Sequence, residues 1–159
     1  MDQGSDAHFL RRVIQPGLLG LMDGSVSTLA PLFATAFATH DTHISFLIGT
    51  AAATGAGISM AFAEGLSDDG ILTGRGHPVI RGSITGLMTF VGGIFHTLPF
   101  LLQSFSHALF LAYLIVGVEL FVIAFIRYWY MKMNFWLSIL QVVVGGALVF
   151  LAGYLIGSS

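Results

Sequence analysis

Five long apolar stretches dominate this sequence and leave room for little except membrane-spanning helices. At a rise of about 1.5 Å per residue, each stretch is long enough to cross a hydrocarbon core of about 30 Å. The stretches are continuous and lack the alternation of apolar and polar residues that a β-barrel requires, and helices satisfy their own backbone groups in lipid. We therefore expect an all-α polytopic membrane protein. Its five transmembrane helices are expected at about 16–38, 44–64, 79–102, 108–127 and 135–157.

Composition supports the same class. Hydrophobic residues make up 55% of the chain and charged residues 9%, and the mean hydropathy is +0.87, which does not describe a water-soluble globule. The length of 159 residues allows five spans with little left for a soluble domain, so we expect one transmembrane domain over residues 1–159. The absence of cysteine excludes thiolate metal ligands and iron–sulfur clusters. We expect no permanently bound cofactor, no enzyme activity and no nucleic-acid partner.

The distribution of basic residues predicts the orientation. In a five-span chain, all of them fall on one side of the membrane, whereas connections 40–43 and 103–107 and the tail 157–159 carry neither Lys nor Arg. The positive-inside rule then places the N-terminus in the cytoplasm and the C-terminus outside. A cleavable signal peptide is not expected, because the first apolar stretch is too long for one and follows the polar start, residues 1–6. The basic residues are Arg11, Arg12, Arg75, Arg81, Arg127 and Lys132.

An acidic residue, Asp23, lies deep in the first span. Its insertion costs roughly 2.5 to 3.5 kcal/mol, which favours an ion or proton site. Met60 and Glu64 are spaced i and i+4 on the second span and so share one helix face. Counting inward at 1.5 Å per residue, Asp23 lies about 16 Å past Arg12 and Met60 about 12 Å past Asp68, at similar depths. A thioether with two carboxylates favours Fe²⁺, Mn²⁺ or Co²⁺ over Mg²⁺ and Ca²⁺. These three residues are our candidate metal ligands.

Each candidate has a simpler explanation. A membrane methionine such as Met60 is packing far more often than a ligand. Glu64 could be a helix-end residue that reaches the lipid headgroups. Asp23 is harder to dismiss, because no intramembrane Lys or Arg is available to pair with it.

Two further polar residues, His96 and Glu119, are expected within the membrane. Glu119 is a candidate proton carrier, although a structural hydrogen bond to a serine, a threonine or the backbone explains it equally well. For His96, close to Pro99, capping of backbone groups freed by the proline is the simpler account.

Small residues form stripes at i+4 spacing on the first two spans, which predicts close helix contacts. The adjacent face of the second span would then line a narrow groove that ends at Met60 and Glu64. The stripes are Gly20 and Gly24 on the first span, and Gly49, Ala53, Gly57 and Ala61 on the second.

Three motifs together resemble the vacuolar iron transporter family over most of the chain. The run 23–28 is similar to the family's Asp-Gly-x-x-Ser-Thr signature, and residues 59–64 are similar to its Ser-Met-x-x-x-Glu signature. Gly92, Gly93 and Pro99 fit its third-span pattern, with His96 where a proline is common. The resemblance implies a five-helix homodimer whose ion path lies at the two-fold axis and is lined by Asp23 and Met60. It also implies export of Fe²⁺, with Mn²⁺ as a second substrate, from the cytoplasm by proton antiport.

One departure from the family concerns the connection at 65–78, which is too short for the cytoplasmic metal-binding domain that many members carry. Its sequence is similar to the subgroup in which a ferritin-like, rubrerythrin-type domain precedes the transporter. The resemblance implies a bacterial inner membrane and one of two arrangements: a ferritin-like domain fused or associated at the cytoplasmic side, or a stand-alone relative. We expect Asp68 and Asp69 to attract the metal at the entrance.

Two other functions compete with transport. The chain could be a membrane anchor or assembly domain for a soluble ferritin-like domain without transport of its own, although Asp23 argues against this. A haem-binding subunit using His96 would need a facing histidine at the same depth, and the other five lie near the ends of the spans.

Overall fold

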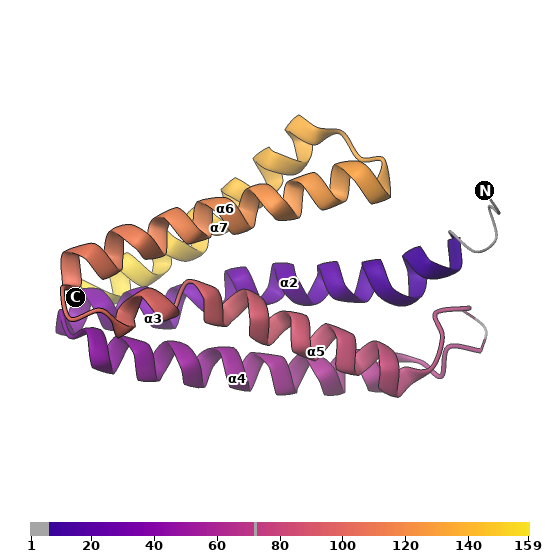
Figure 1. The fold of residues 1–159 in the computed structure, drawn as a ribbon, viewed down its shortest axis with the longest axis horizontal. Helices are drawn as coiled ribbons and strands as arrows, with labels where there is room; N and C mark the ends of the chain where they lie inside the picture. The colour runs from indigo at the N-terminus through magenta and orange to yellow at the C-terminus, as the bar shows by residue number, and fades with distance from the viewer. Residues whose placement is uncertain (1–6, 72) are drawn as a thin grey trace.

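The computed structural model describes residues 7–71 and 73–159, in which all regular elements are helices. The polar start, residues 1–6, lies outside the described residues, as does position 72 within the short connection. Five described helices are long and apolar enough to cross a membrane, at Ala7–Thr39, Thr42–Ser67, Pro78–Phe95, Phe105–Met131 and Phe135–Gly157. This confirms the all-α, five-span prediction. Figure 1 shows the elements: η1 (Leu10–Ile14), α2 (Gln15–Ser27), α3 (Leu29–Thr39), α4 (Thr42–Ser67), α5 (Pro78–Phe95), η2 (Leu98–Leu101), α6 (Phe105–Met131) and α7 (Phe135–Gly157).

The first span is interrupted at Thr28, between α2 and α3. Pro31 has no N–H to donate to the carbonyl of Ser27, so the regular hydrogen-bond ladder fails at this point. The Thr28 hydroxyl donates to the carbonyl of Gly24 at 2.8 Å, and its own carbonyl accepts from the amide of Leu32 at 3.2 Å. At this interruption Thr28 lies in the interior of the bundle, where it is fully buried.

The third span ends as an α-helix earlier than the sequence suggested. We expected a helix through residue 102, but α5 ends at Phe95 and the chain turns at His96 and Thr97 into the short η2. Pro99 explains the difference, because its ring clashes with the carbonyl four residues earlier and cannot donate to it. This turn places His96 inside the bundle, fully buried.

Helix α5 packs against both α2 and α4, and lies between them in Figure 1. The small-residue stripes make these contacts. A Cβ at Gly24 would overlap the backbone carbonyl of Thr89 on α5, and one at Gly57 would lie 2.9 Å from the carbonyl of Gly86. The glycines of α2 and α4 therefore bring both helices close to the backbone of α5.

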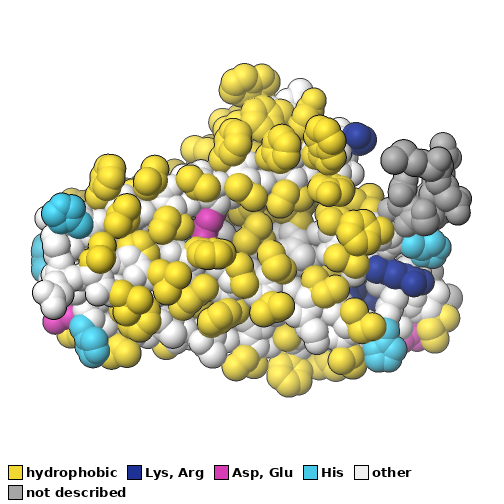
Figure 2. Space-filling view, in the orientation of Figure 1, with side chains coloured by type: hydrophobic (Ala, Val, Ile, Leu, Met, Phe, Trp, Pro, Cys, Tyr) yellow, Lys and Arg dark blue, Asp and Glu magenta, His cyan; other side chains and the backbone are white. Residues whose placement is uncertain are grey.

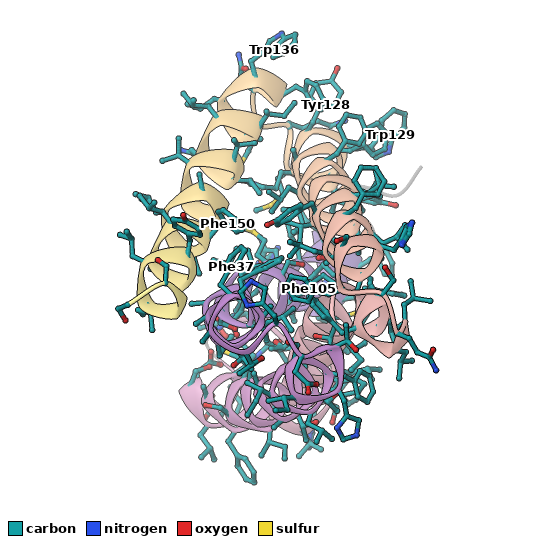
Figure 3. All side chains as sticks on the ribbon, turned by 90° about the vertical axis from the view of Figure 1, so that its left-hand side faces the viewer. Phe37, Phe105, Tyr128, Trp129, Trp136 and Phe150 are labelled. Atoms are coloured by element: carbon teal, nitrogen blue, oxygen red, sulfur yellow. The ribbon has the colours of Figure 1, made fainter. Side chains whose placement is uncertain are left out.

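An aromatic cluster joins α3 to the hairpin of α6 and α7. Phe33 stacks on Tyr113 of α6 at 5.3 Å between ring centroids and meets the edge of Phe150 of α7 at 5.2 Å. Phe37 also packs edge-on against Phe150, and Figure 3 shows these two side chains close together between α3 and α7. At the other end of the hairpin, Trp136 and Trp129 project from the outside of the bundle (Figure 3).

The visible surface is banded in the way expected of an integral membrane protein. Hydrophobic side chains cover the middle of the molecule, histidine side chains lie at both ends, and the visible Lys and Arg side chains lie towards one end only (Figure 2). One acidic side chain is visible among the hydrophobic ones in the middle of this face (Figure 2). The hydrophobic band matches the requirement for a lipid-facing surface.

Candidate functional site

Asp23 lies in the last turns of α2, and its residue is only partly exposed. None of the ion pairs between described residues involves it. Met60 on α4 is likewise partly exposed. No hydrogen bond or ion pair within the described chain joins Asp23 to Glu64. Asp23 is therefore a carboxyl group in an apolar span without a charged partner among the described residues.

The described part of the chain contains no cluster of carboxylates and imidazoles arranged around a metal site. Within residues 7–71 and 73–159, no three His, Asp or Glu side chains form a group able to hold a metal ion. A metal path built on Asp23 would need ligands of another kind, such as a thioether, or ligands from a second protomer.

Glu64 is placed differently from Asp23. Its carboxylate oxygen Oε1 lies 2.5 Å from Arg75 Nη2 and 2.6 Å from Arg81 Nε, and its side chain is only 7% exposed. Two guanidinium groups thus contact one buried carboxylate. Pairing of this kind offsets the cost of burying the charges, which is several kcal/mol per ion when unpaired. In this structure the Glu64 carboxylate is part of an ion-pair network.

Arg81 also caps the end of α4. Its side chain is 1% exposed, and Nη2 donates to the backbone carbonyls of Glu64 and Asp68, each at 3.0 Å. The last carbonyls of a helix have no partner within the helix, so a neighbouring arginine can satisfy them and complement the negative end of the helix dipole. Arg81 therefore holds the start of α5 to the end of α4.

Asp68 organises the connection between these two helices. Its carboxylate accepts hydrogen bonds from the Thr73 hydroxyl at 3.0 Å and from the Gly70 amide, and it pairs with Arg75 at 3.3 Å. Partial desolvation acts to raise the pKa of Asp68, but these hydrogen bonds and the charges of Arg81 and Arg75 outweigh it and hold the pKa below its ordinary value. Asp68 thus stays ionised within the loop.

Asp69 stands apart from this network. It is exposed, and its Oδ1 accepts the amide of Ile71 at 3.0 Å in a local turn. Of the two aspartates expected at the entrance, one is engaged by arginines and the other faces outward.

A second polar centre lies inside the bundle. His96 Nδ1 is 3.0 Å from Glu119 Oε2 on α6, and His96 Nε2 is 2.7 Å from the Thr28 hydroxyl oxygen. His96 and Thr28 are fully buried, and Glu119 is 8% exposed. Ser25 lies beside the Glu119 carboxyl, yet neither Ser25 Oγ nor Glu119 Oε1 has a hydrogen-bond partner in the described part of the chain.

The expectation that His96 caps the backbone near Pro99 is wrong. Both ring nitrogens contact side chains, because the turn after α5 directs the ring towards α2 and α6. The structural partner expected for Glu119 was a serine, a threonine or the backbone, whereas the hydrogen bond of its Oε2 is to the histidine.

Sequence reasoning missed Arg75, Arg81 and Thr28 as parts of these polar centres. A signal for Arg81 was present, since an acidic residue ends one span and a basic residue begins the next across a short antiparallel connection. For Thr28, the signal was a hydroxyl three residues before an intramembrane proline.

Comparison with known proteins gives one match. The model of the VIT family matches residues 65–158, which is more than half of the chain. The matched segment covers the loop after α4 and the helices α5, α6 and α7, whereas Asp23, Met60 and Glu64 precede it. Searches of curated proteins and of solved structures gave no match.

Proposed function

The chain belongs to the VIT family, and from this premise we propose that it exports a divalent transition metal, Fe²⁺ or Mn²⁺, from the cytoplasm in exchange for protons. The family accounts for the general activity, transport of metal ions across a membrane. The identity of the metal, the direction and the proton coupling are our proposal.

Asp23 is the observation that carries it. A carboxylate within an apolar span is costly, and this one has no ion-pair partner among the described residues. Binding of a cation would offset that cost. Since metals bind the ionised carboxylate, an arriving metal displaces a proton, which links metal movement to proton movement.

We place the path between two copies of the chain. The described part of one protomer offers no group of three carboxylate or imidazole ligands. Asp23 and Met60 are both partly exposed, so a second copy can contribute the same pair across a two-fold axis. Two carboxylates and two thioethers would suit a transition metal.

Glu64, Asp68 and Asp69 form the proposed entrance at the cytoplasmic ends of α4 and α5. Asp69 is exposed and available to attract a cation. Glu64 and Asp68 are held by arginines, so they can bind metal only after Arg75 releases them. A ferritin-like domain at this side, in a bacterial inner membrane, would deliver Fe²⁺ to the same end.

The experiment is metal flux into liposomes that contain the purified chain, read with an internal metal-quenched dye and a pH dye. We expect Fe²⁺ to enter with opposite proton movement in wild type, and flux to fall at least tenfold in Asp23→Asn and in Met60→Ala. Asp41→Asn is the matched control, because Asp41 caps the external start of α4 and asparagine caps equally well.

Three results would decide against this proposal in different ways. Wild-type flux in Asp23→Asn with unchanged pH dependence would remove Asp23 from the path. Equal flux of Mg²⁺ and Fe²⁺ would contradict the role of the thioether. A folded wild-type dimer without any metal flux would favour the anchor for a soluble iron-binding domain.

A further inference from the structure

The hydrogen bonds around His96 determine where its protons are. The Thr28 hydroxyl has one hydrogen, and it is donated to the carbonyl of Gly24 at 2.8 Å, since a carbonyl can only accept. The contact of 2.7 Å between Thr28 and His96 Nε2 must then be a bond in which the ring nitrogen donates. Nε2 therefore carries a hydrogen in every protonation state that preserves this network.

The remaining ring nitrogen, Nδ1, shares one proton with Glu119. A hydrogen bond at 3.0 Å between Nδ1 and Oε2 requires a proton between them. Either a protonated Nδ1 donates to the carboxylate, or a protonated carboxyl group donates to a neutral ring. Both descriptions give a pair with no net charge and one proton to release.

We propose that His96 and Glu119 form a single proton-binding site inside each protomer, and that release of its shared proton is coupled to the arrival of the metal ion. The coupling rests on the proposed transport function. The existence of the site rests on the geometry of the pair alone.

The surroundings make the charge of this pair sensitive to a nearby cation. Loss of the shared proton leaves one negative charge among apolar groups, with only hydroxyls beside it, which is costly. Ser25, next to the Glu119 carboxyl, lies two residues from Asp23 on α2, so these two side chains leave opposite sides of the helix, and a cation at Asp23 would be separated from the pair by about the 10 Å width of a helix. A divalent cation held at Asp23 would stabilise the deprotonated pair and so favour release of its proton.

Few other charged groups face the pair. On α2 the nearest is Asp23, while α3, η2 and α7 contain no Asp, Glu, Lys, Arg or His. On α5 and α4, Arg81 and Glu64 pair with each other at the end of their hairpin. On α6, Arg127 is two helical turns from Glu119 and hydrogen-bonded to Gln141. The remaining histidines of α4 and α6, His43 and His107, are exposed in the first turns of those helices. Binding of a metal ion at Asp23 is therefore the change in charge that we expect to affect protonation of the pair most.

Two buried oxygen atoms near the pair are free to take part in proton transfer. Glu119 Oε1 and Ser25 Oγ are buried, and neither has a hydrogen-bond partner in the described chain. One oxygen of the Glu119 carboxyl group is therefore without a partner among the described residues, whereas the other is engaged by the histidine.

The test is proton release on metal binding, measured in weakly buffered detergent solution with Co²⁺ as a redox-stable probe. Glu119→Gln is the informative variant, because its amide can donate to Nδ1 and preserve the hydrogen bond but has no proton to release. We expect wild type to release one more proton per protomer than Glu119→Gln while both bind Co²⁺. Ser138→Ala, which removes a similarly buried and unpartnered hydroxyl on α7, is expected to match wild type.

Equal proton release by wild type and Glu119→Gln, at equal Co²⁺ binding, would overturn the proposal and leave the pair as a structural hydrogen bond. If Glu119→Gln fails to fold, Glu119→Met, which also has no proton to release, replaces it with the same expected loss. If wild type binds no metal, the transport proposal fails separately. Infrared titration of the carboxyl and imidazole bands between low and high pH then decides the site: a band of either group that titrates in wild type and is absent in Glu119→Gln supports it, and no such band overturns it.

Discussion

Replacement of Gly20 by alanine tests the packing that positions α2 on α5. A Cβ at Gly20 would overlap the backbone carbonyl oxygen of Thr85 and lie 3.0 Å from the amide nitrogen of Thr89. Both atoms belong to the backbone of α5, and the same carbonyl accepts the Thr89 hydroxyl at 2.9 Å, so neither can rotate away as a flexible side chain would. Accommodation requires the two helices to separate.

The size of the effect follows from two opposing contributions. Overpacking in a tight contact typically costs about 1 to 3 kcal/mol, and an overlap with backbone belongs at the upper end of that range. Alanine is favoured over glycine within a helix by about 1 kcal/mol. We therefore expect Gly20→Ala to lower the free energy of unfolding by about 2 kcal/mol.

Two glycines provide matched controls. A Cβ at Gly117 on α6 or at Gly145 on α7 would meet nothing within 4 Å. The same substitution there should leave stability unchanged or raise it slightly, because only helix propensity acts. The assay is reversible unfolding in mixed micelles by a rising fraction of denaturing detergent, followed by circular dichroism. If Gly20→Ala is as stable as Gly117→Ala, the close contact between α2 and α5 is not what the structure indicates.

The ion-pair network at the end of α4 gives two further predictions. Arg81→Met should lower the free energy of unfolding by about 3 to 5 kcal/mol, because it removes one partner of a buried pair, and Arg81→Met combined with Glu64→Gln should recover part of that loss in the same unfolding assay. The pKa of Asp68 is lower in the folded protein than in the unfolded chain, so the ionised carboxylate stabilises the α4–α5 loop at any pH above the ordinary aspartate pKa of about 3.9. This stabilisation is lost as the pH falls through the lower pKa of the folded state. Limited proteolysis of the loop by an acid-active protease should therefore accelerate below this pH in wild type, and Asp68→Asn should be susceptible at every pH tested.

The spans were predictable because hydropathy acts over some twenty residues at once, and one misplaced polar group changes little. The helices accordingly begin and end within about four residues of the expected bounds, except that the first helix begins at Ala7, nine residues before the expected start at 16, and where prolines intervene. At Pro99 the proline ends α5 early, and at Pro31 it interrupts the first span. Both prolines are visible in the sequence, and each indicates that a helix is interrupted nearby. Where the side chains of His96 and Thr28 then point depends on the turn that the chain adopts, which the sequence does not reveal.

The polar pairs were not predictable to the same degree. Pairing of His96 with Glu119 joins residues 23 positions apart, one in the turn after α5 and the other on α6, and it depends on the rotation of α6 about its own axis. Pairing of Glu64 with Arg81 depends on the phase of two helices across a short loop. A few degrees of helix rotation decide such contacts, and hydropathy does not determine that rotation.

The different surroundings of Asp23 and Glu64 constrain how a metal could use both. The Glu64 carboxylate already pairs with two guanidinium groups, so a metal ion that binds there must compete with Arg75 and Arg81. None of the ion pairs between described residues involves Asp23, so a metal ion there meets no such competition. The two arginines are not equivalent, because Arg75 is 29% exposed and lies in the loop while Arg81 is 1% exposed and caps α4. Release of Arg75 costs less, since water can solvate it, and it would also free Asp68. If Glu64 binds metal, Arg75 and the loop between α4 and α5 that carries it must move first. This loop is too short to form a metal-binding domain, but its movement would then control access of the metal to Glu64.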